Sequence, residues 1–291
     1  SGEFNASVSE LNALRSMGVD ASLIHFPEDL FPRKHHLFAR VLTFIAFLWS
    51  SRAYREVKFL IKKFEPDIVH FHGIFPYLSS SAFDAAWHFN TPVIQTLHNV
   101  RWLCVEGGYY RKSEFCNICT TKGKSYLGVF YGCYYGFIPS AIMFLSSLIA
   151  KRSGSLFKRV DRFIAVSDFI KEQHILGGFP AEKILVKHNS INSDYFSCIK
   201  PSSTRHGFAF IGRVSVSKGS EVLKYLISKI SEPIQIVGDG PDLSDLKSFC
   251  KKYGYDHVKF WGKQPQLRCF EIMTSVVCTV VPSQCGESFS L

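Results

Sequence analysis

The amino-acid sequence predicts an α/β protein made of two domains, each built around a parallel β-sheet. Short apolar runs alternate along the chain with longer segments whose apolar residues recur at helical spacing. Several of these runs end in glycine, histidine or serine just before a helical segment begins, as parallel strands commonly do. A chain of 291 residues is also long enough for two domains that each bury a core.

The first domain is predicted to cover residues 1–199. It opens on a glycine-containing loop and a helix over Ala6–Met17, followed by a strand over Val19–Phe26 and a long helix over Phe38–Phe64. Because no strand precedes the first helix, we expect the domain's first strand to be missing. The remaining predicted strands are Asp67–Phe71, Pro92–His98, Phe163–Ser167 and Lys183–Asn189, and the remaining predicted helices are Ser80–Phe89, Ser140–Ala150 and Asp168–Leu176.

The second domain is predicted to cover residues 207–291, after a polar linker at Lys200–His206. It begins with a strand, a loop and an amphipathic helix across Phe208–Ile227. The elements after it are strands at Pro233–Val237, His257–Gly262 and Val276–Val281, and helices at Leu243–Tyr253 and Leu267–Thr274. These strands should present their following loops at one shared edge of the sheet.

Two cations in the first of these loops, Arg213 and Lys218, indicate an anion site. The following helix would point its N–H groups and positive dipole end at the same edge. The planar guanidinium of Arg213 can bind two oxygens at once, and Lys218 adds a compact ammonium charge. Together these two cations suit a diphosphate better than a single carboxylate. The alternative is a pair of solvated surface cations in an ordinary loop.

Histidines end two strands of the first domain. His98 follows a strand at the edge where open α/β sheets bind ligands, which makes it a candidate site residue. His70 and His72 lie two residues apart on one strand, so both should face the same side of the sheet. We rank His72 below His98, because a histidine there could equally be a packed structural residue.

An inserted segment at residues 101–135 carries four cysteines, Cys104, Cys116, Cys119 and Cys133. A Cys-x-x-Cys pair with two further thiols at loop distances can close a tetrahedral zinc site that staples a glycine-rich loop. Four reduced, buried cysteines explain the same residues equally well.

Composition limits the compartment and the partners. A hydrophobic content of 46% excludes a disordered chain. The nine cysteines are an odd number and do not resemble the disulfide framework of a secreted protein, so they indicate a reducing cytosol. A net charge of +10 favours anionic partners, including acidic lipid surfaces. Nucleic acid is not expected as a partner, because the basic residues are scattered and no nucleic-acid fold signature is present.

Two apolar segments raise the question of a membrane. Ser125–Ala150 has no charged side chain, but proline and glycines interrupt it, and Arg40 interrupts Leu37–Trp49. We predict buried or membrane-surface helices at both, and a cytoplasmic protein peripheral to the inner face of the membrane.

The motifs together resemble the retaining GT-B glycosyltransferases of family four. The second-domain motifs are Phe210-Ile-Gly-Arg213 with Lys218-Gly219, Val237-Gly-Asp-Gly-Pro241, and Val281-Pro-Ser283 with Glu287. The first-domain motifs are Asp67-Ile-Val-His-Phe-His72, Thr96-Leu-His-Asn99 and Ala165-Val-Ser167. The stretch from Leu97 to Cys104, with the later cysteines, is similar to a cysteine-bearing subgroup of that family.

The resemblance implies two Rossmann-like domains facing a cleft and sugar transfer from a nucleotide-diphosphate-sugar to a glycan, lipid-linked or other acceptor, with retention. It implies no cofactor for catalysis, so zinc would be structural only. The catalytic residues it implies are His98, Arg213, Lys218 and Glu287, with Arg213 and Lys218 on the diphosphate. The donor- or substrate-binding residues it implies are Gly2, His72, Asn99, Asn189, Gly212, Gly238, Gly240 and Ser283.

The sequence departs from the family pattern at both ends, where the first strand and a second family glutamate are absent. We therefore expect the chain as given to be a fragment that does not turn over. A non-catalytic nucleotide-binding or scaffold protein on the same fold is the main alternative. A dinucleotide oxidoreductase is disfavoured, because neither glycine turn is a Gly-x-Gly-x-x-Gly that opens a helix. A zinc-stapled nucleic-acid binder would show salt-dependent affinity for DNA.

Overall fold

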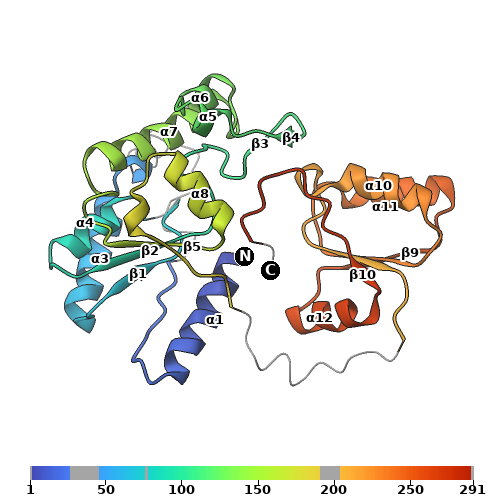
Figure 1. Cartoon of the computed structure of the whole chain (residues 1–291), viewed down its shortest axis with the longest axis horizontal. Helices are drawn as coiled ribbons and strands as arrows, with labels where there is room; N and C mark the ends of the chain where they lie inside the picture. The colour runs from blue at the N-terminus through green and yellow to red at the C-terminus, as the bar shows by residue number, and fades with distance from the viewer. Residues whose placement is uncertain (1, 27–45, 76–77, 191–203, 290–291) are drawn as a thin grey trace. The chain divides into compact units, whose positions relative to one another are not determined.

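The computed structural model describes residues 2–26, 46–75, 78–190 and 204–289, which form two compact units (Figure 1). The first unit comprises Ser1–Tyr109, Asn117–Ser190 and Ser288–Leu291, and the second comprises Tyr110–Cys116 and Ile191–Glu287. The predicted linker at 200–206 lies mostly outside the described residues. Each unit contains one four-stranded parallel sheet, which confirms the predicted α/β class.

The sheet of the first unit has the strand order β1-β2-β5-β6, and all three pairings are parallel. Its strands are β1 (Val69–Phe71), β2 (Val93–Leu97), β5 (Arg162–Ala165) and β6 (Ile184–Val186). Its helices are α1 (Gly2–Ser16), α3 (Ser51–Phe64), α4 (Ser81–Trp87), α5 (Ile118–Thr121), α6 (Leu127–Phe130), α7 (Phe137–Arg152), α8 (Asp168–Leu176) and the 3₁₀ turn η2 (Ala181–Lys183).

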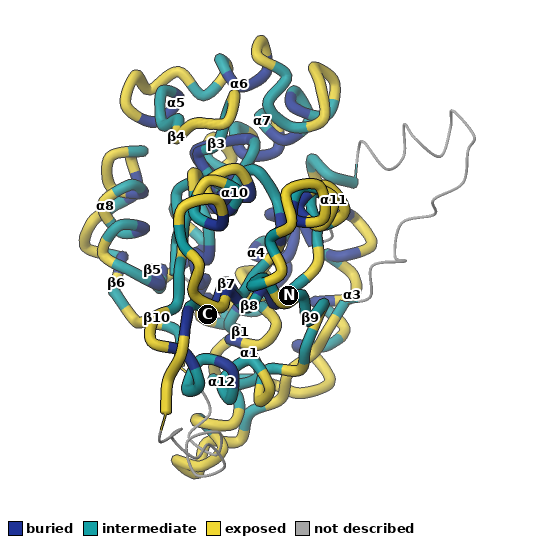
Figure 2. The backbone as a smooth tube through the Cα atoms, turned by 90° about the vertical axis from the view of Figure 1, so that its right-hand side faces the viewer, coloured by how far each residue is buried: buried dark blue, intermediate teal, exposed yellow. Residues whose placement is uncertain are grey.

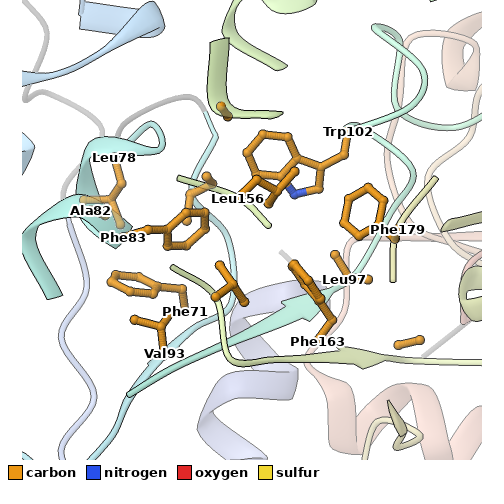
Figure 3. Packing of buried hydrophobic residues seen from close by; sticks show 14 of the residues in the cluster. Phe71, Leu78, Ala82, Phe83, Val93, Leu97, Trp102, Leu156, Phe163 and Phe179 are labelled. Carbon is orange, nitrogen blue, oxygen red and sulfur yellow. The ribbon is translucent and has the colours of Figure 1, made fainter. Parts of the chain in front are cut away.

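The core of this unit lies on one face of its sheet. Alternate strand residues such as Phe71, Leu97 and Phe163 point to that face, where helices α3, α4 and α8 cover them. Figure 3 shows the aromatic rings of this core, including Phe83 and Trp102, packed against the strand side chains. Helix α1 lies toward the other face, where the intervening strand residues point (Figure 1).

The sheet of the second unit has the order β10-β7-β8-β9, again parallel throughout. Its strands are β7 (Phe208–Ile211), β8 (Ile234–Val237), β9 (Val258–Gly262) and β10 (Cys278–Thr279), and its helices are η3 (Val216–Lys218), α10 (Ser220–Lys229), α11 (Leu243–Tyr253) and α12 (Gln266–Ser275). Helices α10 and α11 cover one face of this sheet and α12 covers the other (Figure 1).

Most predicted elements are confirmed within three residues at each end, and α8 and α11 begin and end where the sequence predicted. One strand prediction is wrong, since residues 19–26 form no strand. A strand is stable only through pairing with a neighbour, and this segment instead bonds back to helix α1, with Arg15 Nε donating to the Ala21 carbonyl at 2.9 Å.

Three helix starts also differ from prediction. Helix α1 begins at Gly2, where a loop was predicted. The predicted helix over Phe38–Phe64 is interrupted, because Ser50 caps α3 by accepting from the Ala53 N–H at 3.1 Å; residues 38–45 lie outside the described part. Helix α7 starts before Pro139, which its first turn accommodates because no N–H is needed there.

The predicted insertion at 101–135 contains a small antiparallel hairpin of β3 (Tyr110–Arg111) and β4 (Glu114–Phe115), besides α5 and α6. Among the helices that the structure describes, none is both long enough and apolar enough to cross a bilayer.

Candidate functional site

Three histidines gather beside the carboxyl ends of β1 and β2. Because side chains alternate along β1, Phe71 enters the core while His70 and His72 share the opposite face, with ring centroids 4.4 Å apart. The His72 and His98 rings stack at 5.3 Å. The structure therefore brings His72 and His98 together, while their roles in substrate binding stay predictions.

Hydrogen bonds fix these rings in place. His70 Nε2 lies 2.8 Å from the Thr96 hydroxyl, and His72 Nδ1 lies 3.0 Å from His98 Nε2. Burial lowers the pKa of His72 and of His98 to about 4, and it also lowers the pKa of His70. All three rings are therefore neutral at pH 7, so they act as hydrogen-bonding groups rather than as fixed cations.

Glu10 and Lys187 complete this cluster from distant parts of the chain. Glu10 comes from α1 and lies 3.4 Å from His70 Nδ1 and 3.7 Å from His72 Nε2. Lys187, which follows β6, places its Nζ 2.8 Å from Glu10 Oε2. Burial by itself raises the pKa of Glu10, but the hydrogen bond from Lys187 and nearby positive charge more than reverse this and leave it lowered. Neither residue was among the predicted site residues, because a charge on an amphipathic helix and one after a strand carry no local signal.

A small cavity of about 180 Å³ lies next to the histidines. His72, His98 and Asn99 line it, together with Glu3 and the buried side chain of Gln95. Asn99 donates from Nδ2 to Glu3 Oε1 at 2.9 Å, and the Gln95 side-chain oxygen has no hydrogen-bond partner within the described chain. An unpartnered buried oxygen in a cavity wall suits a polar ligand.

Two predicted substrate residues of the first unit, Gly2 and Asn189, are not among the residues that line this cavity. Gly2 lies exposed in the first turn of α1, so the loop predicted at this position is wrong. A role of Gly2 in substrate binding stays a prediction. Asn189 is half-buried beyond β6, two residues after Lys187.

The second unit gathers predicted donor-site residues at the carboxyl edge of its own sheet. Lys218 and Glu287 form an ion pair, and Ser283 donates from Oγ to Glu287 Oε1 at 2.5 Å. Arg213 begins the same loop and is exposed. The structure thus brings Lys218, Ser283 and Glu287 together, although they are up to 69 residues apart.

Glycines allow the loops of this edge to approach closely. A Cβ on Gly238 would lie 1.9 Å from the Gly212 carbonyl oxygen, and a Cβ on Gly240 would lie 2.1 Å from the Val214 oxygen. The two glycines of the predicted donor motif therefore let the loops that follow β7 and β8 pack directly against each other at this edge.

The cysteines present a different picture. Cys104 and Cys119 are buried, and burial raises the pKa of the Cys104 thiol despite backbone N–H groups that hydrogen-bond its sulfur. Among the described side chains, Cys104, Cys116, Cys119 and Cys133 do not supply three ligand atoms within 4.8 Å of one another. Zinc at the cysteines therefore stays a prediction.

Comparison with known proteins decides the family. The model of Glycosyltransferase Family 4 matches residues 8–195, which is more than half of the chain. The chain belongs to glycosyltransferase family 4. An uncharacterized 42.6 kDa protein in the cps region of Klebsiella pneumoniae is 26% identical over 188 residues, which are 64% of this chain and 43% of that protein.

Solved structures share the fold. Anabaena Alr3699/HepE in complex with UDP and glucose has a TM-score of 0.53 at 16% identity, covering 82% of this chain and 57% of that chain. The same protein in complex with UDP has a TM-score of 0.51 at 16% identity, covering 79% and 56%. The predicted GT-B fold is confirmed at the level of its two parallel α/β sheets. The family 4 chain described here spans about half the length of these relatives.

Proposed function

We propose that this family 4 chain belongs to an enzyme that transfers a sugar from a nucleotide-diphosphate-sugar to a glycan, lipid-linked or other acceptor, with retention of configuration. The observation that carries the proposal is the gathering of Lys218, Ser283 and Glu287 in the second unit, whose glycine-containing loops pack closely against each other at the same edge of the sheet. UDP in the Anabaena HepE complexes makes UDP the first nucleotide to test.

In this proposal the second unit binds the donor. Lys218 and Arg213 hold the diphosphate and stabilise the charge that develops as it leaves. Glu287 accepts hydrogen bonds from the donor, while Ser283 fixes the carboxylate. Because Lys218 pairs with Glu287, a bound diphosphate would compete with that carboxylate for the ammonium group.

The first unit contributes neutral hydrogen-bonding groups. His98 donates or accepts a hydrogen bond with a sugar hydroxyl, and Asn99 and His72 line the same cavity. Its volume of about 180 Å³ is below the range for drug-sized ligands, so it suits a single sugar ring better than a whole nucleotide-sugar.

Calorimetric titration with UDP tests the donor site. Arg213→Ala and Lys218→Ala should each weaken UDP binding by about 1.5–3 kcal/mol, which corresponds to roughly 10- to 150-fold in Kd, because each removes a charge-assisted hydrogen bond. Lys251→Ala, an exposed lysine on α11, is the matched control and should bind UDP like the unmodified chain. Unchanged affinity in both loop variants would contradict the proposal.

A turnover assay separates the enzyme from the alternative of a non-catalytic nucleotide-binding protein on the same fold. The protein that carries this chain should release UDP from a UDP-sugar in the presence of an acceptor, and NMR of the product reports its anomeric configuration. Binding without turnover would favour the non-catalytic alternative, and an inverted product would overturn retention.

A further inference from the structure

Glu10, His70 and His72 have the geometry of metal ligands. One oxygen or nitrogen atom from each of them lies within 4.8 Å of the other two. Among the described residues, these three side chains therefore bring possible metal ligands close together. The Glu10 oxygens lie 3.4 Å from His70 Nδ1 and 3.7 Å from His72 Nε2. The first distance ends at Oε1 and the second at Oε2, so the carboxylate faces both imidazoles. Two ligands placed about 2.1 Å from a tetrahedral zinc ion are about 3.4 Å apart, so separations of this size fit a shared ion that Glu10 would bind through one or both oxygens.

A strand and a helix hold these three side chains in position. His70 and His72 leave the same face of the sheet because they are two residues apart on the path of β1, and Glu10 faces them from α1. A His-x-His pair with a carboxylate from another element supplies two nitrogens and one oxygen. This donor set suits zinc and other divalent first-row metals.

Neighbouring residues already hold the two imidazoles by their other nitrogens. His70 Nε2 forms a hydrogen bond with the Thr96 hydroxyl, and His72 Nδ1 forms one with His98 Nε2. When each of these nitrogens donates, His70 Nδ1 and His72 Nε2 keep their lone pairs directed at Glu10. Metal-binding histidines characteristically have such an outer partner, which fixes the tautomer.

Exposure and charge leave room for an ion. The side chains of His70, His72 and Glu10 are between 16% and 20% exposed, so water can fill the remaining coordination positions. Lys187 now neutralises Glu10, but its side chain is 44% exposed and can turn into solvent.

We propose that Glu10, His70 and His72 bind one divalent metal ion of the zinc class. These ligands are distinct from the predicted cysteine ligands and from the proposed UDP residues of the second unit. A metal on His72 Nε2 leaves the proton on Nδ1, which must then donate to His98 Nε2. The ion would thereby fix the tautomer of the histidine that lines the sugar cavity.

Titration of chelator-treated full chain with Zn²⁺ and with Co²⁺ tests this proposal. Calorimetry should detect a zinc site whose affinity falls roughly tenfold or more in Glu10→Gln and in His72→Gln, and by about tenfold in Thr96→Val, which removes the outer partner of His70. The matched controls are His88→Gln, directly after α4, and Glu56→Gln, on α3. Both change exposed residues and should bind zinc normally.

Two further measurements keep the proposal falsifiable if a variant folds poorly. Lys187→Met removes the competing cation and should tighten zinc binding, a gain that misfolding cannot produce. Cobalt at this site should show ligand-field bands without thiolate-to-cobalt charge transfer, including in a Cys116→Ser, Cys119→Ser variant. Zinc affinity that is unchanged in Glu10→Gln and His72→Gln, or cobalt bands that disappear with the cysteines, would overturn the proposal.

Discussion

Lys151, near the end of α7, has its ammonium group buried close to the Phe179 ring, 5.8 Å from the centroid. Burial lowers its pKa to about 8. In the unfolded chain the pKa of lysine is about 10.4, so the charged form is disfavoured by folding at neutral pH. This residue therefore works against stability.

Lys151→Met should stabilise the protein by about 1–3 kcal/mol at pH 7, because it removes that penalty and keeps the apolar packing. The sign follows from the lowered pKa: below pH 8 both states carry the charge and the full penalty applies. Between pH 8 and about 10.4 the folded state loses its proton first, so the penalty disappears.

Urea denaturation at pH 7 and at pH 10 measures this effect. The gain from Lys151→Met should be clear at pH 7 and small at pH 10. Lys122→Met, at an exposed position, is the control and should change the free energy of unfolding by less than about 0.5 kcal/mol. Equal gains at both pH values would contradict the burial argument.

At the scale of elements, the second unit depends on close contact between the loops that follow β7 and β8. Gly238 has a φ of +131° and its position leaves no space for a Cβ, since the Gly212 carbonyl would be 1.9 Å away. Only glycine combines that backbone conformation with that contact. The sequence motif is thus a packing requirement as well as a predicted donor site.

Gly238→Ala should destabilise the protein by about 3 kcal/mol or more and weaken UDP binding, because the two loops must separate. Gly254→Ala is the matched control: Gly254 caps α11 with a φ of +69° and open space around it, so we expect a cost of only about 1–2 kcal/mol. Denaturant unfolding, with UDP titration of the folded variants, compares the two. A smaller loss in Gly238→Ala than in Gly254→Ala would refute the packing argument.

At the scale of the whole molecule, charge and exposed aromatic rings point to an anionic surface. The net charge is +10, and the segment around α6 and the start of α7 exposes Phe130, Tyr135 and Phe137, which are 72%, 88% and 60% accessible. Figure 2 shows exposed residues in yellow around α5 and α6, beside the buried residues of these two helices in dark blue. Exposed aromatic rings on a chain of positive net charge favour binding at an anionic membrane interface, which we therefore predict.

We therefore expect the chain to sediment with vesicles that contain anionic lipid at low salt, and less so at high salt, because the Lys and Arg contribution is screened. A Phe130→Ser, Tyr135→Ser, Phe137→Ser variant should lose most of this binding. The control changes Phe59, Phe64 and Trp87, which are also exposed, to serine. Equal binding by both triple variants would exclude the aromatic segment as the contact.

The sequence by itself determined most of the helices and strands of the two parallel sheets, and its motifs indicated the family that the comparison then showed. Periodicity is local, so α8 and α11 could be placed to the residue, and the motif around Lys218 and Glu287 pointed to the edge where those side chains meet. The alternation of side chains along β1 was likewise enough to place His70 and His72 on one face of the sheet.

Only the tertiary structure decided what depends on contacts between distant segments. Residues 19–26 have strand character but form no strand, because a strand needs a partner that local sequence does not reveal. Glu10 and Lys187 are 177 residues apart, and nothing in either neighbourhood indicates that packing brings both to the histidines. Periodicity could decide which way a side chain faces, but only the packed chain could decide what it meets there.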